Sequence, residues 1–208
     1  LPLKYFLEMG KIPRKSGDEK AISDFLVAFA KRFGLEWQRD EALNVLIRKK
    51  GMNGKENSPV VVLQAHMDMV YVKSDDAPHQ YGEPLNVLIG EGTIKANGTS
   101  LGADNGIGMA YIMAILASKD IKHPPIEALF TTNEEEGLIG ASQLKNDWLR
   151  GERLLNLDWE EEGTLVVGGA GGVRSILNKK VARLAALPEN WEYIRVGIAG
   201  LKGGHSGI

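Results

Sequence analysis

The chain has 208 residues, 43% of them hydrophobic, which is enough for one sizeable core and the start of a second domain. Lysine and arginine number 25 against 27 for aspartate and glutamate, and no segment concentrates the basic residues, so a nucleic-acid partner is not expected. No apolar run approaches the roughly 20 residues of a membrane helix, and no charged-then-apolar leader is seen, so we expect a cytoplasmic protein without a membrane partner. There are no cysteines, so any bound metal must be held by His, Asp and Glu.

The first predicted element is an amphipathic helix. Ser16 and Glu19 have the spacing of a capping box, apolar residues then recur at helical spacing, and Gly34 stands where the helix would end. Two apolar runs, Val45 to Arg48 and Val60 to Ala65, predict strands, and the second is expected to be buried on both faces.

The polar, glycine-containing stretch from Val70 to Thr99 predicts a long excursion with its own hairpin. A second apolar helix is expected to open at Asp104 and to run to about Ser118. It is followed by a predicted strand at 126–132, a short helix near 138–147 and a strand from Leu154 to Leu157. This β-α-β-α-β alternation predicts an α/β fold with a mainly parallel sheet and helices on both faces.

Imidazole and carboxylate side chains stand just past the predicted strand ends or at a helix start, where sites form in open α/β sheets. They are His66, Asp104, Glu134 with Glu135, and Asp158. Each has an ordinary structural interpretation when taken alone: a hydrogen-bonded histidine, a helix N-cap, a solvated acidic loop. None has an Arg or Lys partner in the local sequence, and burying carboxylates together without a cation costs on the order of several kcal/mol. The group therefore predicts a divalent-metal site, and a donor set without sulfur suits zinc, manganese or cobalt in a hydrolytic site.

Asp68 stands two residues after His66. Residues i and i+2 of a strand project to the same face, so Asp68 is expected to accept a hydrogen bond from the His66 imidazole and to fix its tautomer. The alternative is an ordinary acidic turn residue.

Five segments, in order, resemble the aminoacyl-histidine dipeptidases (Xaa-His dipeptidases of the peptidase D type), which belong to a di-zinc superfamily that also holds carnosinases and glutamate carboxypeptidases. The segments are HMDMV at 66–70, TSLGADNGIGMA at 99–110, TTNEEEGLIGA at 131–141, LLNLDWEEEG at 154–163 and LKGGHSG at 201–207. Any one motif is a weak signal, whereas five in order along nearly the whole chain are a strong one. The resemblance implies a zinc metallopeptidase that hydrolyses dipeptides, either Xaa-His or with broad specificity.

Carried over residue by residue, the resemblance implies that His66 and Asp158 bind one zinc ion, that Glu135 binds the other, and that Asp104 bridges the two. It also implies a cis peptide bond after Asp104. One family ligand, a histidine of the second site, lies far toward the carboxyl end of full-length relatives. The chain is therefore expected to be a fragment that binds at most one metal ion well and is inactive on its own.

The resemblance also implies roles in catalysis. Glu134 would be the general base for a metal-activated water, and Asp68 would orient His66. His205, in GGHSG, would bind substrate or stabilise the oxyanion. Glu136 is expected to support the amino terminus of the following helix through its charge.

Two domains are predicted: residues 1–172 as the N-terminal part of the catalytic domain, and residues 173–208 as the beginning of a smaller α+β lid domain, through which a homodimer could form. GGAGG at 168–172 could be taken for a phosphate loop, but it lacks the G-x-G-x-x-G order. His205-Ser206 could suggest a serine hydrolase, but GHSG is not a G-x-S-x-G elbow. A non-catalytic protein that retains the peptidase fold is the remaining alternative.

Overall fold

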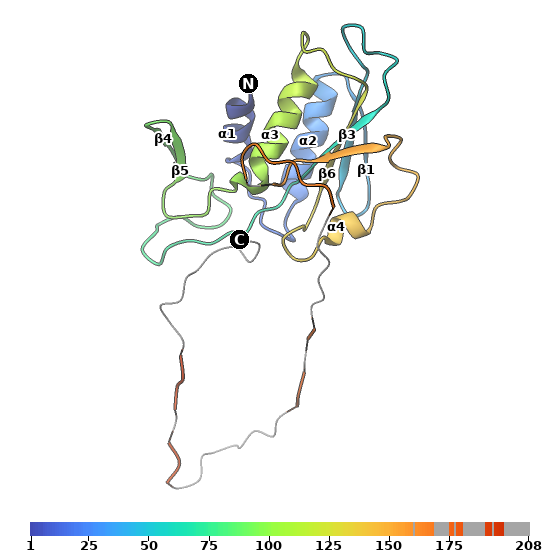
Figure 1. Ribbon diagram of the computed structural model, residues 1–208. Coiled ribbons are helices and arrows are strands. Elements are labelled where there is room, and N and C mark those ends of the chain that lie inside the picture. Colours follow the sequence, from blue (N-terminus) through green and yellow to red (C-terminus); the bar gives the residue numbers. More distant parts are fainter. Residues whose placement is uncertain (160, 169–174, 177, 181–189, 193, 198–208) are drawn as a thin grey trace. The chain divides into compact units, whose positions relative to one another are not determined.

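The computed structural model describes residues 1–159, 161–168, 175–176, 178–180, 190–192 and 194–197 (Figure 1). The chain divides into two units, Leu1–Val166 and Val167–Ile208, and the helices and strands below all belong to the first. Most of the predicted lid domain and most of GGAGG lie outside the described residues, so the predicted domain division stays a prediction.

In chain order the elements are α1 (Pro2–Met9), α2 (Lys20–Arg32), β1 (Glu36–Arg39), β2 (Val45–Lys49), β3 (Val61–His66), β4 (Val87–Gly90), β5 (Thr93–Ala96), α3 (Ala103–Ala117), β6 (Ile126–Thr131), α4 (Ile139–Ser142) and β7 (Arg153–Asn156). Two helices and five strands come first, and helix and strand alternate only from α3 onward. None of the described helices is long and apolar enough to span a membrane.

The central sheet has the strand order β1-β2-β6-β3-β7. β3 pairs in parallel with β6 on one side and β7 on the other, while β2 runs antiparallel to both β1 and β6. Four of the five strands therefore share one direction, which confirms the predicted α/β fold with a mainly parallel sheet. The register places His66 opposite Thr131, so β3 and β6 end side by side.

The two faces of the sheet pack differently. Residues Val45, Ile47, Leu63 and Ala65 face a large core cluster that also contains buried residues of α1, α2 and α3, so these three helices cover one face (Figure 1). Residues that alternate with them, such as Leu46 and Val62, face a small cluster on the other side with Leu144, Trp148 and Leu149, just after α4.

The start of α2 corrects the predicted capping box. The helix begins at Lys20, its N-cap Glu19 makes no side-chain capping bond, and Ser16 Oγ donates instead to Asp68, far away in sequence. The predicted end is confirmed. Gly34 has φ +63° just after the helix, and Leu35 N–H bonds back to the carbonyl of Ala30, as in a Schellman motif.

Other elements were missed or are shorter than predicted. α1 and β1 were not predicted, because α1 is a short helix at the very start of the chain and β1 is largely exposed and lacks an alternating apolar pattern. The hairpin expected within the excursion is confirmed as β4 and β5. α4 has only four residues and is shorter than the helix predicted near 138–147.

Candidate metal centre

The predicted site residues lie together at one edge of the sheet. His66 is the last residue of β3, Glu134 and Glu135 stand just after β6, and Asp158 stands just after β7. Because β6, β3 and β7 are parallel neighbours, their carboxyl ends meet at this edge. Asp104, at the start of α3, completes the group.

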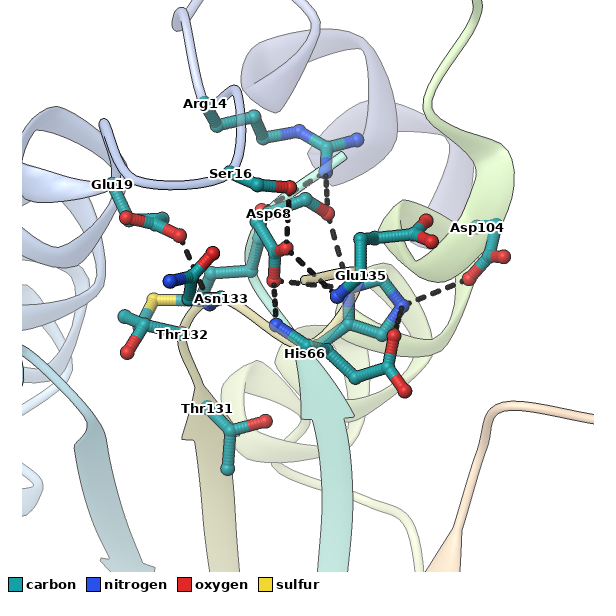
Figure 2. A network of polar contacts seen from close by, with 12 residues as sticks. Arg14, Ser16, Glu19, His66, Asp68, Asp104, Thr131, Thr132, Asn133 and Glu135 are labelled. Atoms are coloured by element: carbon teal, nitrogen blue, oxygen red, sulfur yellow. Dashed lines mark hydrogen bonds and ion pairs between the residues drawn. The ribbon is translucent and has the colours of Figure 1, made fainter. Parts of the chain in front are cut away.

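His66 lies at the centre of the group and is 1% exposed. Its Nε2 is 2.9 Å from Asp104 Oδ1 and 3.5 Å from Asp158 Oδ1. Glu134 Oε2 is 4.0 Å from the same nitrogen. The imidazole therefore presents one nitrogen to three carboxylates from three different segments. Figure 2 shows its contact with Asp104.

Asp68 lies on the other side of the His66 ring, as expected, but the strand has already ended at His66. His66 Nδ1 is 3.1 Å from the main-chain carbonyl oxygen of Asp68 and 3.3 Å from Asp68 Oδ1. The Asp68 carboxylate also accepts hydrogen bonds from Ser16 Oγ (2.8 Å) and from the backbone N–H groups of Glu134 (3.0 Å) and Glu135 (3.3 Å). One buried carboxylate thus holds both the histidine and the turn that carries the two glutamates (Figure 2).

The start of α3 brings Asp104 toward His66. Gly102 at the N-cap has φ +68°, Asp104 and Asn105 have non-helical backbone angles, and the Asp104-Asn105 peptide bond is cis, as the resemblance implies. α3 passes close to the segment that follows β7. A Cβ atom on Gly108 would lie 2.8 Å from the carbonyl oxygen of Leu157, so glycine is needed for this approach.

The three consecutive glutamates are not equivalent. Glu134 and Glu135 are half-buried and lie within reach of His66, whereas Glu136 is exposed. Glu136 does not support a helix terminus as predicted, because α4 begins only at Ile139 and has no acidic residue in its first turn.

Arg14 is the residue of the site that sequence reasoning missed. Its guanidinium is 2% exposed and donates hydrogen bonds to the backbone carbonyls of Met67 (3.0 Å), Asp68 (3.1 Å) and Gly102. No pattern in the sequence links this arginine to residues 53 or more positions away. The acidic residues lack a cationic partner in the local sequence, as stated above, but the fold brings Arg14 close to them.

Electrostatics show what this arrangement favours. Burial alone would lower the pKa of His66, but its hydrogen bonds with Asp104, Asp158 and Asp68 outweigh burial and raise the pKa to about 12. Burial raises the pKa of Glu134, and the charges of Asp158, Glu135 and Asp68 add to that effect. Without a metal ion, the site therefore holds a proton on His66 and makes ionisation of Glu134 harder, as expected of a cluster that favours a cation.

The donor atoms fit metal ions. Two groups offer one ligand atom per residue with all atoms within 4.8 Å of one another: His66, Asp104 and Asp158 in one, and His66, Glu134 and Glu135 in the other. Imidazole and carboxylate donors without sulfur suit zinc, manganese or cobalt. The first group matches the ligand set expected for one ion. In the second, Glu135 lies with Glu134 and His66, and its predicted pairing with Asp104 stays a prediction.

A cavity of about 200 Å³ opens beside the group, between Glu134 and Asp158 and a wall of leucines. A larger cavity of about 660 Å³ lies elsewhere, near the start of β6, and its lining includes Arg48 and Glu127, which are paired with each other. The smaller cavity is the one that adjoins the candidate site. His205 lies outside the described residues, so its predicted role in substrate binding stays untested.

Comparison with known proteins agrees with this geometry. The sequence profile of Peptidase family M28 matches residues 44–170, more than half of the chain. The cytosol non-specific dipeptidase of Escherichia coli (strain K12) is 43% identical over 203 residues, which cover 97% of this chain and 42% of that protein.

Solved structures give the same result. The aminoacylhistidine dipeptidase from Vibrio alginolyticus superposes with a TM-score of 0.75 and 46% identity, over 78% of this chain and 34% of that one. A tripeptidase from Staphylococcus aureus superposes with a TM-score of 0.65 and 26% identity, over 77% of this chain and 43% of that one. The chain spans less than half the length of each of these three relatives. The resemblance drawn from the five motifs is confirmed, and the chain belongs to peptidase family M28.

Proposed function

We propose that the complete protein carrying this chain is a metal-dependent dipeptidase. The observation that carries the proposal is the pair of ligand groups that share His66 at the carboxyl ends of three parallel strands. Two relatives are named as dipeptidases and one as a tripeptidase, which supports short peptides as the substrate class. The name of the E. coli relative supports the cytosol as the location.

Within this proposal, His66, Asp104 and Asp158 hold one metal ion, and Asp104 and Glu135 contribute to a second. Zinc is the proposed ion, with manganese or cobalt as substitutes, because the donor set is one imidazole among carboxylates. Two such ions would polarise the scissile carbonyl and lower the pKa of water.

The protein's own groups then divide the remaining work. Glu134 takes the proton from the attacking water and passes it to the leaving amine, a role that suits a half-buried carboxylate whose pKa burial raises. Asp68 keeps His66 in one orientation through the Nδ1 side of the ring. His205, in the proposed lid domain, contacts the substrate.

The test is a series of glutamate-to-glutamine substitutions in the complete protein. Glu134→Gln keeps the size of the side chain but removes the base, so metal content should stay at the parent level while dipeptide turnover falls by about 10² to 10⁴-fold. Glu135→Gln removes an anionic ligand, so metal content should fall and activity should partly return with added zinc or cobalt. Glu136→Gln is the matched control and should behave like the parent, because this side chain is exposed.

Elemental analysis and dipeptide hydrolysis are measured side by side for the three variants. Loss of metal in Glu134→Gln with full metal in Glu135→Gln would show that the two roles are reversed. A parent protein that binds metal but hydrolyses no dipeptide would favour the alternative, a non-catalytic protein that retains the peptidase fold.

The 208-residue chain offers a second test. It contains three proposed ligands for one ion but only Asp104 and Glu135 for the other, so we expect it to bind no more than one ion tightly and to hydrolyse dipeptides poorly. Efficient turnover by this piece would refute the proposal that a further histidine ligand is needed. The lid domain at 173–208 and a homodimer formed through it remain part of the proposal, and sedimentation of the complete protein tests the dimer.

A further inference from the structure

Arg14 makes an unusual set of contacts for a buried cation. Although it lies beside carboxylates, it donates hydrogen bonds to three backbone carbonyl oxygens: Met67 and Asp68 accept from Nη1, and Gly102 accepts from Nη2. The first two carbonyls belong to the loop that follows His66 and carries Asp68. The third belongs to the turn that leads into Asp104.

The protein leaves space for this guanidinium. A Cβ atom on Gly106 would lie 2.7 Å from Arg14 Nη2, and one on Gly102 would be closer still. The backbone of the first turn of α3 is thus shaped around the planar group. A guanidinium holds its donors in a rigid fork, so three fixed bonds leave little freedom for either loop.

Two neighbouring side chains extend the same connection. Ser16 Oγ donates to Asp68 Oδ2, and Glu19 Oε1 accepts the backbone N–H of Asn133 at 2.9 Å, just before Glu134 (Figure 2). The segment from Arg14 to Glu19 therefore contacts three of the loops that carry proposed ligands. This segment lies outside residues 44–170, which match the family profile.

We propose that Arg14 is a positioning residue of the metal centre, which sets the distance between His66 and the Asp104 carboxylate by joining the backbone just after His66 to the turn that leads into Asp104. The inference rests on the proposed metal-dependent function and concerns how the site is held rather than what it binds. His66 Nε2 and Asp104 Oδ1 lie 2.9 Å apart, and ligand atoms displaced by even a few tenths of an ångström bind metal less well.

The charge of Arg14 and its hydrogen bonds predict opposite changes in metal affinity when the residue is replaced. A cation near Asp68 and Asp104 repels metal ions, so if charge alone mattered, its removal would tighten metal binding. If Arg14 acts through its hydrogen bonds, its removal loosens both loops and weakens metal binding. The direction of the change therefore separates the two effects.

The test compares three variants of the complete protein by chelator competition for cobalt and zinc and by the visible spectrum of the cobalt form. Arg14→Met removes the fork and the charge but keeps an unbranched apolar stem. Arg14→Lys keeps the charge, but one ammonium group cannot reach three carbonyls together. Lys15→Met is the matched control, since it removes an exposed cation from the adjacent position.

We expect Arg14→Met to weaken metal binding by about tenfold or more, in the range seen when residues that support metal ligands are removed, and to change the cobalt spectrum. Arg14→Lys should weaken binding by a smaller factor, and Lys15→Met should stay at the parent value. A purely structural role would lower the unfolding temperature of the metal-free and metal-loaded forms equally and leave the metal dissociation constant unchanged.

Metal binding by Arg14→Met that equals or exceeds that of the parent would overturn the proposal. If Arg14→Met does not fold, Arg14→Lys decides, and parent-level affinity in that variant would overturn it equally. An equal loss of affinity in Lys15→Met would also overturn it, because that variant leaves all the Arg14 contacts in place. A parent protein that binds no metal would refute the metal centre itself, which is a separate result.

Discussion

Asp68 offers the sharpest quantitative prediction. Its carboxylate is fully buried, and although burial opposes ionisation, hydrogen bonds from His66, the Glu134 backbone and Ser16 lower its pKa from 3.8 to about 2. A group whose pKa is depressed in the folded state stabilises the protein above its unfolded pKa, and this contribution is lost as the pH falls through the folded value. The depression corresponds to about 2 kcal/mol at pH 7 and about 1 kcal/mol at pH 3.

At pH 7, Asp68→Asn should lower the free energy of unfolding by more than these 2 kcal/mol. The two carboxylate oxygens face backbone N–H donors of Glu134 and Glu135, so the amide NH₂ of an asparagine would meet a donor whichever way it turns. Leaving a buried donor unsatisfied costs about 1 to 3 kcal/mol. We therefore expect the free energy of unfolding to fall by about 3 kcal/mol at pH 7, and by about 1 kcal/mol less than that at pH 3.

Urea unfolding of the metal-free protein at the two pH values measures this loss. Asp75→Asn is the matched control, because it removes one carboxylate from an exposed position and should change stability by no more than about 0.5 kcal/mol. A loss in Asp68→Asn that is the same at pH 7 and pH 3, or that does not exceed the control, would refute the reasoning from the buried carboxylate.

Three further predictions follow from the contacts. Metal binding at pH 7 should release a proton, and metal affinity should fall as the pH falls, because the raised pKa of His66 keeps its ring protonated in the metal-free site. Calorimetry in buffers of different ionisation enthalpy measures the released proton. Metal binding without proton release would contradict the prediction. Glu127→Gln should lower the free energy of unfolding by about 1 to 3 kcal/mol, since it removes a buried charge that accepts hydrogen bonds from Arg48 and from the backbone N–H groups of Arg150 and Gly151, yet leave metal affinity at the parent value. Gly108→Ala should weaken metal binding and lower stability by about 1 to 3 kcal/mol, because the new Cβ would push against Asn105 Oδ1, next to Asp104, and against the Leu157 carbonyl, next to Asp158. An unchanged metal affinity would show that this close packing does not position the ligands.

The motifs predicted the candidate site better than the scaffold around it. His66, Asp104, Glu134, Glu135 and Asp158 could be singled out because strand ends are marked by local hydrophobic patterns, and strand ends are where parallel sheets gather side chains. The division of the acidic run was also partly predictable, since consecutive residues leave a strand end in different directions. Which of the two glutamates ligates and which acts as base stays a prediction.

Capping and pairing were predicted less well, because a local pattern has several possible partners. Ser16 and Glu19 have the spacing of a capping box, but in the folded chain Ser16 donates to Asp68 and Glu19 accepts the Asn133 N–H. Both side chains gain a buried partner that an isolated helix could not offer. The strand β2 was predicted from its apolar run, but its antiparallel place between β1 and β6 has no signature in the sequence.

The sequence by itself thus determined the fold class, the main strand ends and the set of side chains that meet at them, because hydrophobic periodicity and turn residues act over a few neighbouring positions. Only the tertiary structure decided that Arg14 joins the loops at Met67 and Gly102, at separations of 53 and 88 residues. Arg14 can be buried because the folded backbone supplies carbonyl acceptors in a fixed arrangement, and backbone acceptors carry no side-chain identity that a sequence could reveal.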